Sequence, residues 1–104
     1  MSILSITFHT VEDRIKEWDL YVDNDLHQMI ENLIDVEKYI LSEVHSDMVN
    51  EGKNTNLFLL FDNAEIRDQF MESEMVNLAE RINQRFGEEV MIFPTFLNSK
   101  KKRF

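Results

Sequence analysis

Residues 2–9 alternate between apolar and polar side chains, which is the period of a half-buried β-strand. One face of this strand carries Leu4, Ile6 and Phe8, and the other carries Ser5, Thr7 and His9. Apolar residues then recur at helical spacing from residue 11 to residue 33, after Thr10 as the helix N-cap. The run Asp23-Asn24-Asp25 has the weakest helix propensity in this segment, so we expect the helix to bend or break there.

A second strand is predicted over Val36–His45, where apolar and polar positions again alternate. We assign its more apolar set, Val36, Ile40 and Val44, to the face that packs against the helices. The segment Ser46–Asn56 is polar and contains a glycine, which is typical of an open connection between two strands.

The last third of the chain predicts a strand, a helix and a final strand. Leu57–Asp62 is apolar on both faces. Asp62 and Glu65 match a capping box, which predicts that a helix starts here, and Gly87 stands where a glycine ends a helix. Val90–Leu97 then forms the last strand.

The resulting order, βαββαβ, is typical of the split-βαβ or ferredoxin-like fold. Right-handed crossovers place the strands of an antiparallel sheet in the order 4-1-3-2, with both helices on one face. Pro94 agrees with this order, because proline is confined to edge strands and the fourth strand is an edge. The sequence therefore predicts an α+β protein with a single ferredoxin-like domain over residues 1–99 and a basic C-terminal tail over residues 100–104.

Two helices cover only one face of such a sheet, yet the third and fourth strands carry large apolar side chains on both faces. A water-exposed face rarely carries such a patch. We expect a second copy of the chain to cover it, and we assign four residues to the interface: Phe58, Leu60, Ile92 and Phe96. The alternative is a lone domain whose own loop or tail covers the face.

Charge then limits the partners. The net charge is −9, and four of the eleven basic residues are Lys100–Arg103, so only seven basic residues oppose twenty acidic ones over the rest of the chain. Nucleic-acid phosphates require a positive face, so we expect no nucleic-acid binding and interpret the tail as a solvated end. The acidic surface would suit a basic protein partner.

Other signals are absent from the sequence. There is no cysteine, and no apolar run approaches the ~20 residues of a membrane span. The first residues do not resemble a signal peptide. We therefore expect a cytoplasmic protein with no membrane partner, no metal and no cofactor.

One group of residues could line a pocket. In this topology His9 and His45 end at the same edge of the sheet, about 10 Å apart, on the face away from the helices. Thr7, Tyr39 and Glu43 are assigned to the same face. A histidine there could act as a general base oriented by Glu43. Strand-end residues that meet solvent or a partner are the alternative, so we assign the five residues to ligand binding and assign no catalytic residue.

A resemblance adds to this picture. Over nearly its whole length the chain resembles a bacterial family of short proteins of unknown function with a dimeric α+β barrel fold. The resemblance rests on Ile6-Thr7-Phe8 in the first strand, on Trp18 in the first helix, and most on the closing stretch Arg85-Phe86-Gly87-Glu88-Glu89-Val90 with Phe93, Thr95 and Leu97 after it. The resemblance implies the fold and dimerisation, and it implies no reaction. In that family a His-x-Pro break follows the helix tryptophan, and here the matching region is Asp23-Asn24-Asp25.

Three functional classes remain open. The first, which we favour, is a small interaction or regulatory module that dimerises and presents an acidic helix face to a basic partner. The second is a dimeric barrel that binds a small ligand. The third is a cofactor-independent barrel enzyme that uses His9 or His45. A lumen with converging polar groups would favour the second or third class, and a closed apolar interface would favour the first.

Overall fold

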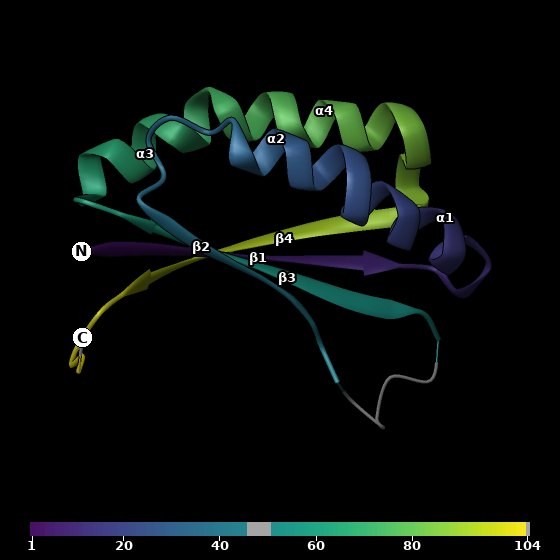
Figure 1. Ribbon diagram of the computed structural model, residues 1–104, viewed down its shortest axis with the longest axis horizontal. Helices are drawn as coiled ribbons and strands as arrows, with labels where there is room; N and C mark the ends of the chain where they lie inside the picture. The colour runs from purple at the N-terminus through teal and green to yellow at the C-terminus, as the bar shows by residue number, and fades with distance from the viewer. Residues whose placement is uncertain (46–50, 104) are drawn as a thin grey trace.

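The structure, a computed structural model, describes residues 1–45 and 51–103. Its four strands are β1 (Ser2–Thr10), β2 (Lys38–Glu43), β3 (Lys53–Phe61) and β4 (Val90–Asn98). They form one antiparallel sheet in the order β2-β3-β1-β4, which confirms the predicted order. The helices all lie over one face, and none of the helices among the described residues lies on the opposite face, which is drawn below the sheet in Figure 1.

The first helical segment runs through Asp23–Asp25 without a break. It consists of the 3-10 turn η1 (Glu12–Arg14), α1 (Ile15–Tyr21), the π-helical turn η2 (Val22–Leu26) and α2 (His27–Glu31). The Asn24 side chain donates to the Leu20 carbonyl over 2.8 Å, a bond that competes with the backbone ladder. The weak stretch therefore widens the helix into a π turn. No helix among the described residues is both long and apolar enough to cross a membrane.

The second helical segment divides at Ser73. It comprises α3 (Ala64–Glu72), α4 (Glu74–Phe86) and the 3-10 turn η3 (Gly87–Glu89). The N-cap is Asn63, whose Oδ1 accepts from the Ile66 amide over 2.9 Å, so the predicted cap at Asp62 is wrong by one residue. Gly87 ends α4 at φ +58°, as predicted.

Two other predicted boundaries are wrong. Thr10 is the last residue of β1 and caps no helix; Val11 stands at the N-cap of η1. The third strand begins at Lys53, four residues before Leu57, so the last four residues of the predicted connection are strand. Residues 46–50 of that connection lie outside the described residues.

Trp18 lies at the centre of the core, between the sheet and both helical segments. Its side chain is fully buried, and its ring lies 5.4 Å from Phe8 of β1 and 5.4 Å from Phe86 of α4, centroid to centroid. Its indole Nε1 donates to Thr55 Oγ1 of β3 over 3.1 Å. This bond satisfies the one polar atom of the largest buried side chain, so Trp18 joins α1, α4, β1 and β3.

The face assignment of the second strand is wrong by one residue. Tyr39 and Leu41 pair with Leu59 and Leu57, which face the helices, so Tyr39 and Leu41 face the helices too. Ile40 therefore lies on the opposite face, where 58% of its surface is exposed. Side chains alternate along a strand, so this shift exchanges the two faces of β2.

The Trp18–Thr55 hydrogen bond yields a direct test. Thr55→Val removes the acceptor and leaves a buried indole N–H unpaired, which should lower the free energy of unfolding by about 1–3 kcal/mol. The control is Glu72→Gln on the exposed side of α3, away from the open face, where we expect a change within about 0.5 kcal/mol. Urea denaturation measures both, and equal stability of the two variants would contradict this role of Thr55.

Candidate functional site

The face of the sheet without helices, here called the open face, is built from alternate residues of all four strands. Register assigns Ile3, Ser5, Thr7 and His9 of β1 to it. It also assigns Lys38, Ile40 and Ser42 of β2, Asn54, Asn56, Phe58 and Leu60 of β3, and Met91, Phe93, Thr95 and Leu97 of β4. No helix of residues 1–45 or 51–103 covers this face (Figure 1), so its composition decides what it can contact.

Apolar side chains occupy much of the open face. Phe93 is 52% exposed and Met91 is 45% exposed on β4, and Ile40 is exposed on β2. Phe58 is part-buried beside Ile40, and Leu60 is almost fully buried next to it. Large apolar side chains exposed on both edges of one sheet face mark it as an interaction surface.

A polar strip, made of Ser5, Thr7 and His9 of β1 with Asn54 and Asn56 of β3, crosses these apolar residues. Asn56 Nδ2 donates to Ser5 Oγ over 2.9 Å and lies 3.4 Å from Thr7 Oγ1. His9 Nδ1 lies 2.6 Å from Asn54 Oδ1. Five hydrogen-bonding side chains on the two central strands therefore lie together and run to one end of the face.

The Asn54 contact selects one form of the His9 imidazole. Because Asn54 Oδ1 is an acceptor, Nδ1 is the ring nitrogen that donates to it, and in the neutral ring this leaves the lone pair on Nε2. Gly52 approaches the same ring so closely that a Cβ there would lie 3.1 Å from His9 Nε2 and only 2.2 Å from the Thr10 carbonyl oxygen. Gly52 has φ +107°, a conformation that favours glycine, and its lack of a side chain leaves room for the imidazole.

The structure does not bring the five predicted ligand-binding residues together. Thr7 and His9 lie on the open face, whereas Tyr39 and Glu43 lie on the face that the helices cover. His45 follows the end of β2 and is exposed. The reversed face assignment of β2 explains the separation.

Tyr39 and Glu43 have partners on the helical side. The Tyr39 hydroxyl donates to Glu31 over 2.5 Å, and this bond raises the pKa of Tyr39. Glu43 accepts from Lys53 Nζ over 2.8 Å, and this bond lowers the pKa of Glu43. Both contacts tie β2 to its neighbours in the fold.

The four residues assigned to the interface lie on two different faces of the sheet. Phe58 and Leu60 lie on the open face, as predicted. Ile92 and Phe96 pair with Phe8 and Leu4 of the core face, so both are on the helical side. There Phe96 lies under the guanidinium of Arg67, 4.9 Å from its Cζ.

Sequence reasoning missed Asn54 and Asn56, because both fell in the predicted connection. A signal was present: Thr55, Leu57 and Leu59 alternate with Asn54 and Asn56 in one continuous pattern of period two. Residues 53–56, at the start of this strand, are all polar, so they were interpreted as part of a loop. Within residues 1–45 and 51–103, no group of three or more histidine, cysteine or acidic side chains converges to hold a metal ion.

The model of a family described as a domain of unknown function, DUF4286, matches residues 1–100. The chain belongs to the DUF4286 family. This match confirms the resemblance drawn from the helix tryptophan and the closing strand. No curated protein matches this DUF4286 chain at a significant level.

Solved structures share the fold with the DUF4286 chain at low sequence identity. HapK from Hahella chejuensis has a TM-score of 0.68 at 8% identity, covering 100% of this chain and 97% of its own. A protein described as dimeric and ferredoxin-like, from an uncultured marine organism, has a TM-score of 0.58 at 12% identity, with coverage of 100% and 99%. MhuD, solved with two manganese protoporphyrin IX molecules per active site, has a TM-score of 0.62 at 10% identity, with coverage of 98% of both chains. These likenesses confirm the ferredoxin-like fold.

The tautomer of His9 can be measured directly. We expect long-range proton–nitrogen NMR spectra of the neutral ring to show the His9 hydrogen on Nδ1, and Asn54→Ala to remove this preference. Asn98→Ala, at the opposite end of the sheet, should leave the His9 signals unchanged. A wild-type ring protonated at Nε2 would show that Asn54 does not orient it.

Proposed function

We propose that this DUF4286 protein is a homodimer whose two open faces pack against each other and enclose a site for a small molecule lined by the polar strip. The unit that dimerises in this proposal is residues 1–99, with residues 100–104 as a tail. The single observation that supports it best is the polar strip itself, placed among exposed apolar side chains.

Dimerisation follows from the apolar part of the open face. Two sheets that pack face to face lie about 10 Å apart, so side chains such as Phe93, Met91 and Ile40 would interdigitate with those of a partner. A two-fold axis through the face would bring the same surface of both chains into contact, so that each contact between two residues occurs twice, once on each side of the axis. The dimeric ferredoxin-like protein with the same fold supports this arrangement by analogy of fold.

The polar strip argues for a lumen within that dimer. Ser5, Thr7 and Asn56 hold more donors and acceptors than they use against one another. Pressing them against apolar side chains of a partner would bury unpaired polar groups, at a cost of roughly 1–3 kcal/mol each. A space that holds water or a polar ligand avoids this cost. Apolar walls with a few convergent polar groups are typical of small-molecule sites.

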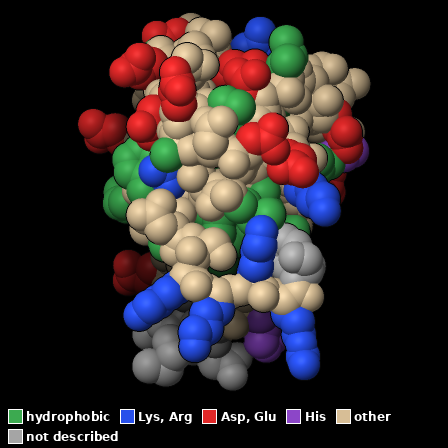
Figure 2. All heavy atoms as spheres, turned by 90° about the vertical axis from the view of Figure 1, so that its left-hand side faces the viewer, with side chains coloured by type: hydrophobic (Ala, Val, Ile, Leu, Met, Phe, Trp, Pro, Cys, Tyr) green, Lys and Arg blue, Asp and Glu red, His purple; other side chains and the backbone are tan. Residues whose placement is uncertain are grey.

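The interaction-module hypothesis uses the same dimer but assigns function to the helical layer. In Figure 2 the aspartate and glutamate side chains lie mostly over the helices, and lysine and arginine side chains gather toward the opposite side. An acidic layer of this kind would suit a basic partner. A closed interface without a lumen would favour this hypothesis over ligand binding.

His9 favours a second candidate function, that of a cofactor-independent barrel enzyme. The Asn54 contact leaves a lone pair on His9 Nε2, which is the form of histidine that accepts a proton from a bound molecule. His45 has no part in this version, because it lies beyond the end of β2 and is exposed.

Dimerisation is tested by placing a charge on the open face. Phe93→Glu would bury two carboxylates at the two-fold interface, so we expect the variant to be monomeric at concentrations where the wild type is dimeric. Leu20→Glu is the matched control, because Leu20 is 65% exposed on the helical layer. Sedimentation equilibrium separates the outcomes. A monomeric wild type, or a dimeric Phe93→Glu variant, would contradict the interface.

The lumen is tested with the fluorescent probe 1-anilinonaphthalene-8-sulfonate. We expect the wild-type dimer to bind the probe saturably, and Asn56→Phe to reduce binding at least about tenfold by filling the space while the protein stays dimeric. Gln69→Phe on the exposed side of α3 is the control and should bind as the wild type does. A dimer that does not bind the probe would favour the interaction module instead.

A further inference from the structure

A groove runs between α4 and the segment from α1 to α2, on the helical layer and away from the open face. At one end it is lined by Tyr21, Asp25, Gln28, Arg81 and Arg85, and its volume there is about 530 Å³. At the other end it is lined by Leu33, Glu74, Asn77 and Glu80, with a volume of about 550 Å³. Met29, Asn32, Arg81 and Gln84 line both ends, so the two volumes form one continuous interhelical groove.

The first end of the interhelical groove carries positive charge that the fold does not neutralise. Arg14, Arg67 and Arg85 each have a carboxylate oxygen within 4 Å, whereas Arg81 forms no ion pair with any of the residues that the structure describes. Arg81 and Arg85 are four residues apart on α4, where two like charges destabilise a helix. An unpaired arginine is unexpected in a chain of net charge −9, and an anion between these two guanidinium groups would relieve their repulsion.

Tyr21 forms the floor of this end of the groove, and core side chains hold it in place. Tyr21 is 6% exposed, and its ring stacks on Trp18 and meets Phe86 edge-on. Burial raises the pKa of Tyr21 and Asp25 raises it further, while Arg81 and Arg85 oppose the rise, so all three charges act on this hydroxyl. Its O–H is therefore a neutral donor at the bottom of the groove.

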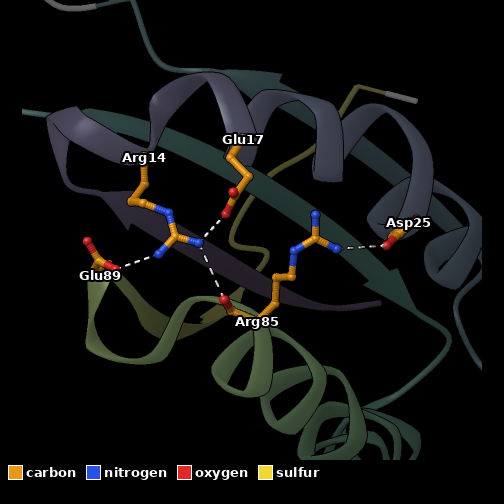
Figure 3. A network of polar contacts seen from close by, with 5 residues as sticks. All are labelled: Arg14, Glu17, Asp25, Arg85 and Glu89. Atoms are coloured by element: carbon orange, nitrogen blue, oxygen red, sulfur yellow. Dashed lines mark hydrogen bonds and ion pairs between the residues drawn. The ribbon is translucent and has the colours of Figure 1, made fainter.

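Arg85 is held by the network of Figure 3. Arg85 Nη1 lies 3.9 Å from Asp25 Oδ2, across the groove. The Arg85 carbonyl accepts from Arg14 Nη2 over 3.4 Å, and Arg14 Nη1 also donates to Glu89 over 2.5 Å. Arg14 thus ties the end of α4 to the start of the first helical segment beside this end of the groove.

The π turn places Asp25 in this wall. η2 spans Val22–Leu26, between Tyr21 on the floor and the groove residues of α2. π-helical turns are rare and occur often at functional sites, because the widened turn redirects its side chains. Here it points Asp25 toward Arg85 rather than along the helix (Figure 3).

The second end of the groove has the opposite charge. Glu74 lines it, forms no ion pair within the described part of the chain, and its Oε2 is buried without a hydrogen-bond partner. Glu80 adds a second carboxylate. A part-buried carboxylate without a cation is unfavourable, so this end favours a cationic donor. Glu74 and Arg81 are seven residues apart on one helix, which is about 10 Å along its axis.

We propose that the interhelical groove binds a short peptide with free termini, its carboxylate between Arg81 and Arg85 and its ammonium group toward Glu74. An extended tripeptide spans about 10 Å, which matches the separation of the two charges. The side-chain amides of Gln28, Asn32, Asn77 and Gln84 offer donors and acceptors for the peptide groups in between. This site is separate from the open face.

Trialanine is the probe that tests the proposal, with binding followed by NMR shifts of the groove's side-chain amides. We expect saturable shifts with trialanine, and affinity at least about tenfold lower for the C-terminally amidated peptide and for the N-acetylated peptide, because each loses a charged hydrogen bond. Arg81→Gln should weaken trialanine binding by the same factor, and Arg81→Lys should restore part of it. Lys16→Gln, an equal change of charge on an exposed face of α1, should bind as the wild type does.

Two results would overturn the peptide site: no saturable shift with trialanine, or equal affinity for the free and the capped peptides. Saturable binding that Arg81→Gln leaves unchanged would overturn it as well. All these variants lie outside the open face, so their failure is distinguishable from failure of the dimer or of its lumen.

Discussion

The hydrogen bond from Trp18 to Thr55 is the constraint on which both candidate sites depend. Thr55 has to face the helices to accept the indole N–H, so its neighbours Asn54 and Asn56 have to face away and form the polar strip. The same tryptophan packs against Phe86 near the end of α4 and against Tyr21 at the floor of the interhelical groove. One buried side chain therefore fixes which face of β3 is open and how far apart the two helical segments lie.

Strand order, helix coverage and the edge position of Pro94 could be predicted from the sequence, because each depends on a strong local signal: period-two alternation, helical spacing or the missing N–H of proline. Which face of β2 packs against the helices could not be predicted from the sequence. Its two sets of side chains are nearly equal in hydrophobicity, with Tyr39 and Leu41 on one side and Ile40 and Val44 on the other, so only pairing with β3 decides between them. Asn54 and Asn56 were missed because polar residues in a strand resemble a loop when the partner strand is unknown.

The two candidate sites differ in how the chain completes them. The interhelical groove is built within one chain, where Arg81 and Glu74 carry opposite charges that no described residue compensates with an ion pair. The open face is half of a site in this proposal. Its apolar side chains are stabilised by burial, whereas the side chains of its polar strip need hydrogen-bonding partners. Packing two copies of the face would bury the apolar side chains and leave a space beside the polar strip for water or a ligand. The dimer and the lumen therefore belong to one proposal.

A crystal structure of the protein tests this central claim most directly. The account predicts a two-fold dimer in which Phe93 and Met91 of each chain are buried against the partner. Between the two sheets it predicts an enclosed cavity of a few hundred Å³, into which Asn56 and Thr7 point. An open face left in solvent would contradict the dimer, and two faces closed on each other without a cavity would contradict the proposed binding site.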